Sequence, residues 1–197
     1  SHYKQKNILG AQRALQFGGD QLLSHNLRLF NCTSSYADRA EFFGEYFYVL
    51  LCGAGCGVSV QKHHVNKIPN IKQRNKQSKV HVVTDDIEGW ATSVDVLLSS
   101  FFENGGKHPE YEGRKIYFDT SKIRKKGAFI SGGFKAPGPE PLISALNKIE
   151  QLINELISKG VDKLSPINVY DIGMFIADAV LSGGVRRSAT IFLFSVD

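Results

Sequence analysis

The sequence predicts a single domain of the α/β class, and three observations support this prediction. Short apolar or alternating runs of strand length separate longer segments whose apolar residues recur at helical spacing. Strands and helices therefore alternate along the chain, as is typical of α/β folds, and no internal repeat interrupts this order. The length of 197 residues favours one domain, and 42% apolar with 22% charged residues is ordinary for a soluble globular protein.

Membrane association and secretion are not expected. No apolar run approaches the ~20 residues that span a bilayer, and no hydrophobic signal core follows the basic start of the chain. The three cysteines are an odd number, so at least one thiol stays unpaired within the chain. Reduced thiols indicate the cytoplasm.

The first part of the chain is predicted to form helix, strand, helix and strand. Residues 8–24 have helical spacing, and residues 27–33 alternate apolar and polar side chains up to Cys32, as in a half-buried strand with a thiol at its end. Asp38 is expected to open a helix that ends in the glycine-rich residues 52–57, before a strand at 58–60. The buried stripe of this helix is predicted to comprise Phe42, Phe43, Tyr46, Phe47, Leu50 and Leu51.

The middle of the chain begins with a basic span at 61–79 that is poor in apolar residues. Residues 80–83 predict a short strand, and Thr84-Asp85-Asp86 offers N-caps for a helix that continues to Phe101. A strand is expected at 116–118.

The last part of the chain contains two predicted helices and a strand. Glycines and prolines exclude regular structure at 131–139, after which apolar spacing over 142–156 predicts an amphipathic helix. Ser165-Pro166 is an N-cap followed by proline at the first helical position. Residues 190–194 are apolar on both faces, which predicts a central strand of a sheet.

Charge is unevenly distributed along the chain. No acidic residue lies between Glu45 and Asp85, so the span is either a solvated loop or a surface that attracts phosphate, on a nucleotide or on nucleic acid. Residues 61–79 contain no Phe, Trp or Tyr, which argues against nucleic acid because base-stacking platforms are missing. The cations of this span are Lys62, Lys67, Lys72, Arg74, Lys76 and Lys79.

No metal site is predicted. Cys52 and Cys56 lie four residues apart beside glycines, but no second pair follows to complete the four ligands of a structural zinc site. His63 and His64 are adjacent, and neighbouring side chains on an extended segment point to opposite faces.

Two stretches, the one that ends at Cys32 and the segment 183–187, carry candidate chemistry. A glycine-rich segment lies between them in the sequence. A single thiol at Cys32 is either a packing residue or a reductant. The glycine-rich residues 53–57 follow a predicted helix and precede a predicted strand, whereas in the dinucleotide fingerprint the strand comes first and the helix last. Glycines at these positions still permit close approach of the backbone to a ligand. The segment 183–187, Gly-Gly-Val-Arg-Arg, is either a solvated turn or a flexible loop whose guanidinium groups contact phosphate or a base. We hypothesise that both stretches face one nucleotide-handling site.

Seven motifs follow one another in a fixed order along the chain. They are RALQFGG at 13–19, Asn31-Cys32, LCGAGCGVSVQ at 51–61, EGW at 88–90, DTSKIRKKGA at 119–128, KAPGP at 135–139 and GGVRRSA at 183–189. Together they closely resemble the adenosylcobalamin-dependent (class II) ribonucleotide reductases, specifically the single-chain ribonucleoside-triphosphate reductase branch. The resemblance covers essentially the whole chain.

This resemblance implies a fold and a domain organisation. Residues 1–197 would form one partial domain, the first part of the ten-stranded α/β barrel of the reductases. The span 62–118 would be an insertion that contributes to the effector site.

The resemblance also implies a reaction. Homolysis of adenosylcobalamin generates a thiyl radical on a cysteine, which removes the 3′ hydrogen of a ribonucleotide. The branch implies a triphosphate, whereas the motifs themselves are shared and leave diphosphate and triphosphate open. Two other cysteines then supply the electrons that replace the 2′ hydroxyl with hydrogen, and Cys32 corresponds to one of them. The implied partners are the ribonucleotide substrate, a dNTP or ATP effector, thioredoxin or a similar dithiol reductant, and the remainder of the reductase chain.

Site residues are assigned by position in the motifs. The residues that match substrate contacts are Asn31, Gly55, Gly57, Arg186 and Ser188, with Arg186 as the contact to the base. The residues that match the effector region are Lys122, Arg124, Lys126, Gly183, Gly184 and Arg187.

The chain departs from the family pattern in two ways. The Asn-Pro-Cys-Gly-Glu signature of the radical cysteine is absent, as is the second reducing cysteine, so this chain alone would not complete the reaction. Most cobalamin contacts would then also lie outside it. Cys56 occupies a position where a small or aliphatic residue is expected. The alternative is a non-catalytic nucleotide-binding piece of the same ancestry, regulatory or split.

Overall fold

The candidate site is built on a parallel sheet whose strands lie far apart in the sequence. The structure, a computed structural model, describes residues 4–8, 10, 12–17, 19–20, 23, 25–129, 135–182 and 188–196. Within these residues the sheet has the order β1-β2-β5. Its strands are β1 (Cys32–Tyr36), β2 (Gly55–Ser59) and β5 (Thr190–Leu193).

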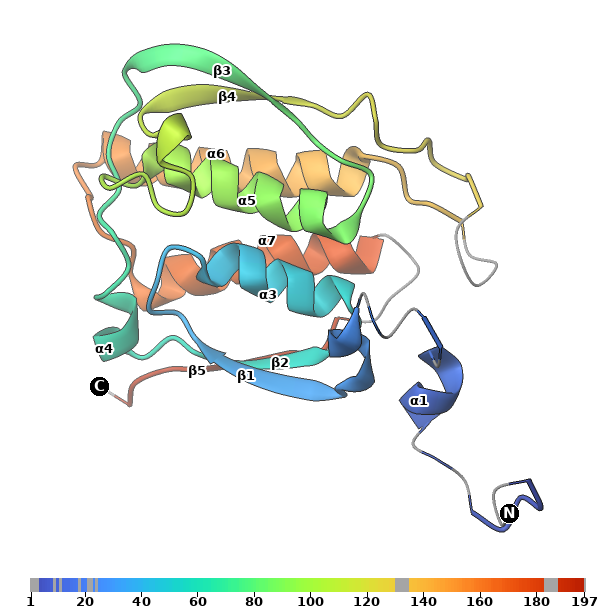
Figure 1. Ribbon diagram of the computed structural model, residues 1–197. Coiled ribbons are helices and arrows are strands. Elements are labelled where there is room, and N and C mark those ends of the chain that lie inside the picture. Colours follow the sequence, from blue (N-terminus) through green and yellow to red (C-terminus); the bar gives the residue numbers. More distant parts are fainter. Residues whose placement is uncertain are drawn as a thin grey trace.

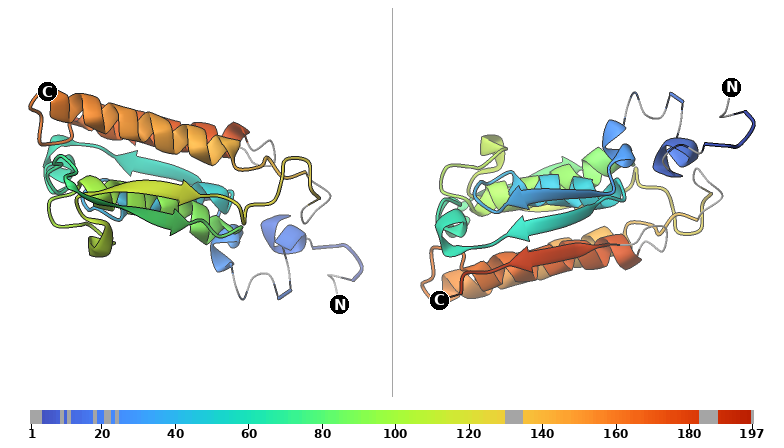
Figure 2. Two further views of the ribbon diagram at one scale, coloured as in Figure 1. Left: turned by 90° about the horizontal axis from the view of Figure 1, so that it is seen from above. Right: turned by 90° about the horizontal axis from the view of Figure 1, so that it is seen from below.

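The described elements stack in four layers (Figure 1). Helices α3 and α7 lie on the β1-β2-β5 sheet, α5 and α6 form the next layer, and a parallel β3–β4 pair lies outermost. Views at right angles show α6 over α7 and β5 along one side of the molecule (Figure 2). The bounds are α3 (Phe42–Leu51), α5 (Ile87–Phe101), α6 (Glu140–Ser158), α7 (Pro166–Ser182), β3 (Lys76–Val82) and β4 (Arg114–Asp119). Shorter helical segments are α1 (Gln12–Phe17), η1 (Asn26–Leu29), α4 (Lys62–Val65) and η2 (Pro109–Tyr111).

Strand register divides the β1-β2-β5 sheet into two unlike faces. Cys32 pairs with Gly55, and Gly57 pairs with Ile191, so these four residues share one face. At the far end of that face, His64 of α4 packs on Tyr36, with 4.7 Å between ring centroids, and its Nδ1 lies 2.9 Å from Ser59 Oγ. We call this face, which is exposed around Cys32, the open face. The opposite, covered face packs on α3 and α7, and there Val58 pairs with Phe192.

The helices form as their apolar spacing predicts. All six residues of the predicted stripe on α3, from Phe42 to Leu51, are buried. On the covered face, the Phe192 ring lies 5.9 Å from the Tyr46 ring and 5.3 Å from the Tyr170 ring, centroid to centroid. Gly173 of α7 provides room for this ring, because a Cβ there would lie 2.6 Å from Phe192 Cζ.

The predicted caps of α5 and α7 are confirmed. The Gly89 amide donates to Asp86 Oδ1 over 2.6 Å at the start of α5. At the start of α7, the Asn168 amide donates to Ser165 Oγ (3.4 Å) and the Ser165 amide donates to Asn168 Oδ1 (3.0 Å), a reciprocal capping arrangement. The expectation that Asp38 opens α3 is wrong, because α3 begins at Phe42 and Asp38 pairs with Arg39.

Two strand predictions need correction. The expected strand at 27–33 is wrong: residues 26–29 form the 3-10 helix η1, and Cys32 is the first rather than the last residue of its strand. The strand expected at 190–194 is confirmed as β5 (Thr190–Leu193), but within the described sheet it lies at the edge rather than in the centre. Ile191 is 61% exposed and Leu193 54%, and both lie on the open face of the sheet.

The basic span 61–79 is more ordered than its composition predicts. It contains α4 and the first residues of β3. Lys72 and Lys76 both pair with Glu112, and Arg74 pairs with Glu150, so much of the charge is neutralised locally. None of the helices in the described ranges has the length and apolarity needed to cross a membrane.

Candidate functional site

The predicted substrate-facing residues meet at the edge of the sheet where its strands begin. The Gly55 amide donates to the Asn31 carbonyl over 2.9 Å, and the Cys56 amide donates to the Ala189 carbonyl over 2.9 Å. Cys32 and Gly57 lie within a residue or two of these bonds, on the open face. Four predicted residues, Asn31, Cys32, Gly55 and Gly57, are therefore neighbours.

Glycine at position 55 permits close packing of the segments that enter the sheet. A Cβ there would lie 3.3 Å from the Ala189 carbonyl oxygen and 3.7 Å from the Asn31 carbonyl oxygen. At Gly57 a Cβ would lie 3.5 Å from Ile191 Cγ2. The two glycines leave bare backbone beside Cys32, where a ligand is able to approach.

The three cysteines have different environments, and all three lie in the described part of the chain. Cys32 is exposed on the open face, whereas Cys52 and Cys56 are buried. Burial raises the pKa of the Cys56 thiol, and its side chain lies on the covered face. Cys56 is therefore a protonated packing residue, and only Cys32 presents its sulfur at the surface.

The buried Tyr46 links α3 to this edge of the sheet by a hydrogen bond. The Tyr46 hydroxyl donates to Thr190 Oγ1 over 3.0 Å, and the Thr190 hydroxyl donates to the Cys56 carbonyl over 3.1 Å. Burial raises the pKa of Tyr46 to about 12, so the phenol keeps its proton and its hydrogen bond. Sequence patterns predicted Tyr46 as core but did not indicate this polar contact.

Arg13 of α1 is a site residue that sequence reasoning did not single out. Its Nη2 donates to the Gly53 carbonyl (2.7 Å) and to Asn31 Oδ1 (3.4 Å), and its Nη1 donates to the Arg28 carbonyl (3.3 Å). Its position at the start of the first motif was the available signal.

The predicted effector residues fall in two segments of the chain. Lys122, Arg124 and Lys126 follow β4, at the end of the molecule where β1 and β2 begin (Figure 1). Lys122 and Lys126 are exposed, whereas Arg124 Nε donates to Asp85 Oδ2 over 2.6 Å. Gly183, Gly184, Arg186 and Arg187 lie outside the described residues.

Ser188 is the first described residue after position 187. It precedes Ala189, whose carbonyl accepts the Cys56 amide. Its hydroxyl is buried and has no hydrogen-bond partner among the described residues.

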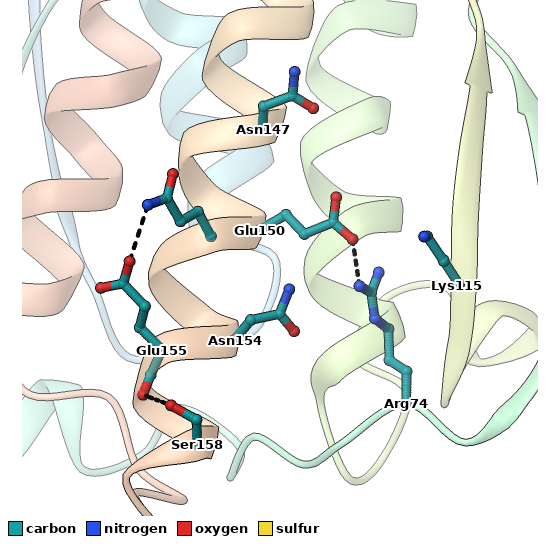
Figure 3. A pocket seen from close by; sticks show the side chains of 8 residues that line it. Arg74, Lys115, Asn147, Glu150, Asn154, Glu155 and Ser158 are labelled. Carbon is teal, nitrogen blue, oxygen red and sulfur yellow. Dashed lines mark hydrogen bonds and ion pairs between the residues drawn. The ribbon is translucent and has the colours of Figure 1, made fainter.

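Two hollows lie elsewhere. One of about 580 Å³ runs beside the polar side of α6, where Arg74 pairs with Glu150 near Lys115 (Figure 3). The other, of about 390 Å³, lies between α3 and α5 and is lined by residues that include Asp95 and Lys107. Neither contains a predicted site residue, and the described part of the chain has no cluster of three or more His, Cys, Asp or Glu that would hold a metal ion.

Comparison with a solved structure defines the class of fold. A crystal structure of a B12-dependent (class II) ribonucleotide reductase superposes with a TM-score of 0.72 at 23% sequence identity, over 96% of this chain and 31% of that chain. The parallel α/β arrangement is thus that of part of a reductase α/β barrel, which confirms the predicted fold class.

Sequence comparisons then identify the family. The family described as B12-dependent ribonucleotide reductase, insertion domain, matches residues 57–153. Adenosylcobalamin-dependent ribonucleoside-triphosphate reductases from Lactobacillus gasseri and Lactobacillus acidophilus are 31% and 30% identical, over 78% and 83% of this chain. This chain belongs to the adenosylcobalamin-dependent (class II) ribonucleotide reductases. It spans about a quarter of the length of these relatives, 24% and 26%.

Proposed function

We propose that the full-length protein reduces ribonucleoside triphosphates to 2′-deoxyribonucleotides, and that this chain supplies one reducing cysteine and the loops for substrate and effector. One observation carries the proposal. Cys32 is the exposed cysteine among the three, and it lies beside Gly55 and Gly57 on the open face. The names of the relatives support the reaction and the triphosphate substrate.

The reduction step requires two thiols. Their oxidation to a disulfide releases two electrons and two protons, which replace the 2′ hydroxyl of the ribose with hydrogen and release water. Cys32 would supply one sulfur, and a cysteine outside this chain the other. Thioredoxin or a similar dithiol would then reduce the disulfide, which an exposed thiol permits.

Adenosylcobalamin supplies the initial radical when it is bound. The described residues of this chain do not fit it: neither hollow adjoins Cys32, and charged and amide side chains dominate the larger one. We therefore assign the cobalamin contacts to parts of the protein outside this chain. What this chain does is hold a thiol and bare backbone at a shared edge.

We assign the substrate and effector contacts to residues near the end of the sheet where β1 and β2 begin. We propose that Asn31, Arg186 and Ser188 contact the substrate with the two glycines. We propose that the effector phosphates meet the cations Lys122, Arg124, Lys126 and Arg187, together with Gly183 and Gly184. The insertion at 62–118 would contribute to the effector site, and the reduced thiols favour the cytoplasm.

The decisive experiment replaces Cys32 by serine in the full-length protein. We expect thioredoxin-supported reduction of ribonucleoside triphosphates to be lost while nucleotide binding stays nearly intact. Cys56→Ser is the matched control, because its thiol is buried on the covered face and should be dispensable for turnover. Unchanged turnover in Cys32→Ser would remove Cys32 from the reducing pair.

A second candidate is a non-catalytic nucleotide-binding piece of the same family. The two candidates differ in whether the full-length protein carries the radical-cysteine motif. Binding of dNTP by the full-length protein without any reduction of ribonucleotides would support this second candidate over the first.

A further inference from the structure

The Arg13 guanidinium joins two loops that lead into the candidate site. Arg28 lies in the 3-10 helix η1, four residues before Cys32, and its carbonyl accepts from Arg13 Nη1 over 3.3 Å. Gly53 follows α3 two residues before Gly55, and its carbonyl accepts from Arg13 Nη2 over 2.7 Å. The same Nη2 lies 3.4 Å from Asn31 Oδ1.

These contacts come from outside both loops. Arg13 lies on α1, 15 residues before Arg28 and 40 before Gly53. Gly53 has a positive φ of 83°, which ends α3 and leaves its carbonyl free to accept from another element. A planar guanidinium is able to serve three diverging acceptors, whereas an ammonium group serves them less well.

The Cys32 thiol lies close to these contacts. Cys32 is the first residue of β1, an edge strand in the described sheet, and its side chain lies on the open face. Before it, Phe30 and Asn31 are exposed. On one side of Cys32 the Gly55 amide donates to the Asn31 carbonyl, and on the other Thr33 Oγ1 donates to the Gly55 carbonyl over 3.2 Å. Arg13 contacts Asn31 and Gly53 beside the first of these bonds.

We propose that Arg13 is a positioning residue that fixes the Cys32 thiol relative to the ribose through the 28–31 segment and Gly53. The proposal rests on the proposed function for its catalytic consequence. Misplacement of a reacting group by about 1 Å costs on the order of 100-fold in rate. Loss of the guanidinium should therefore lower the reduction rate without removing any group that contacts the substrate.

A matched control exists at the other end of the same strand. Arg39 Nη1 donates to the Tyr36 carbonyl over 3.2 Å, and its Nη2 donates to Ser35 Oγ over 3.3 Å. Arg39 thus supports the last residues of β1, whereas Arg13 supports the residues before its start. Nearby, the Ala37 amide donates to the Ser59 carbonyl over 3.0 Å.

The test compares Arg13→Ala, Arg13→Lys and Arg39→Ala in the full-length protein. For Arg13→Ala we expect kcat to fall about 10- to 100-fold with KM within about twofold, and partial recovery in Arg13→Lys. Peptide-resolved hydrogen exchange should accelerate at the Gly55 amide in Arg13→Ala. In Arg39→Ala it should accelerate at the Ala37 amide, with turnover close to that of the unmodified protein.

Several outcomes would overturn the proposal. Unaltered exchange at Gly55 in Arg13→Ala would show that the guanidinium does not anchor this edge. An equal loss of kcat in Arg39→Ala would indicate general support of the strand, and a large rise in KM would indicate a direct substrate contact. An inactive unmodified protein would refute the proposed function instead, and the exchange comparison would still decide whether Arg13 anchors the edge.

Discussion

The two faces of the β1-β2-β5 sheet use the same strands for opposite purposes. On the covered face Val58 and Phe192 pack on helices, and Cys56 is buried with them. On the open face the paired residues are Cys32 with Gly55 and Gly57 with Ile191. Cys32 and Cys56 belong to adjacent strands and differ by one step in register. As a result Cys32 lies in the proposed reaction site, whereas Cys56 lies in the core.

Thiol reactivity should separate the two faces most strongly. We expect an alkylating reagent to modify Cys32 in the native chain, whereas the buried thiols of Cys52 and Cys56 react only when the structure opens. Their rates should be on the order of 1,000-fold lower. Mass spectrometry of the labelled peptides over time measures this ratio, and unfolded chain provides the control. Comparable native rates for Cys32 and Cys56 would abolish the distinction between the faces.

Substitutions of neighbouring residues on β5 should give the next largest difference. Phe192→Ala removes a ring that packs against Tyr46, Tyr170 and Gly173, and should lower the free energy of unfolding by about 3 kcal/mol. Ile191→Ala, at an exposed position, should change it by less than about 0.5 kcal/mol. Urea denaturation of this chain measures both, and equal effects would contradict the assignment of faces.

The buried carboxylate of Asp95 should give the smallest of the expected effects. Asp95 of α5 accepts the Gly44 amide of α3 (3.1 Å) and pairs with Lys107 (2.8 Å), yet burial raises its pKa above the usual aspartate value. The folded state therefore takes up a proton at higher pH than the unfolded state. As pH falls from 7 towards 4, the contribution of Asp95 to stability should rise.

Asp95→Asn is the control for that titration, because its amide oxygen is still able to accept from Gly44. The free energy of unfolding of the original chain minus that of Asp95→Asn should increase as pH falls, measured by urea denaturation at several pH values. A difference that stays constant, or shrinks on acidification, would contradict the raised pKa.

Helices were predictable where local signals agree with burial. The stripe of α3, the Asp86 cap of α5 and the Ser165-Pro166 start of α7 depend on near neighbours in the sequence, and the structure confirms them. The strand at 27–33 failed because alternating apolarity does not distinguish a strand from the exposed 3-10 turn η1. The predicted central position of β5 was not met. Apolar residues on both faces of a strand indicate burial, but they do not determine whether a second strand pairs along its other edge, and none does so among the described residues.

The candidate site was predictable only in part. Family resemblance pointed to Asn31, Cys32, Gly55 and Gly57, and the structure brings these four together. Arg13 escaped because its three acceptors are carbonyl and amide oxygens in distant loops, which no local pattern reveals. Arg186 and its neighbours lie outside the described residues, so their roles stay predictions.

The outer side of β5 has a consequence for handling this chain by itself. Its amide and carbonyl groups on that side have no strand to bond in the described structure, and Thr190–Leu193 contains neither charge nor proline to discourage pairing. An unpaired strand edge of this kind is able to pair with the same strand of a second copy of the chain. Concentrated samples of this chain should therefore associate through β5, and a charged residue introduced on that strand should reduce the association.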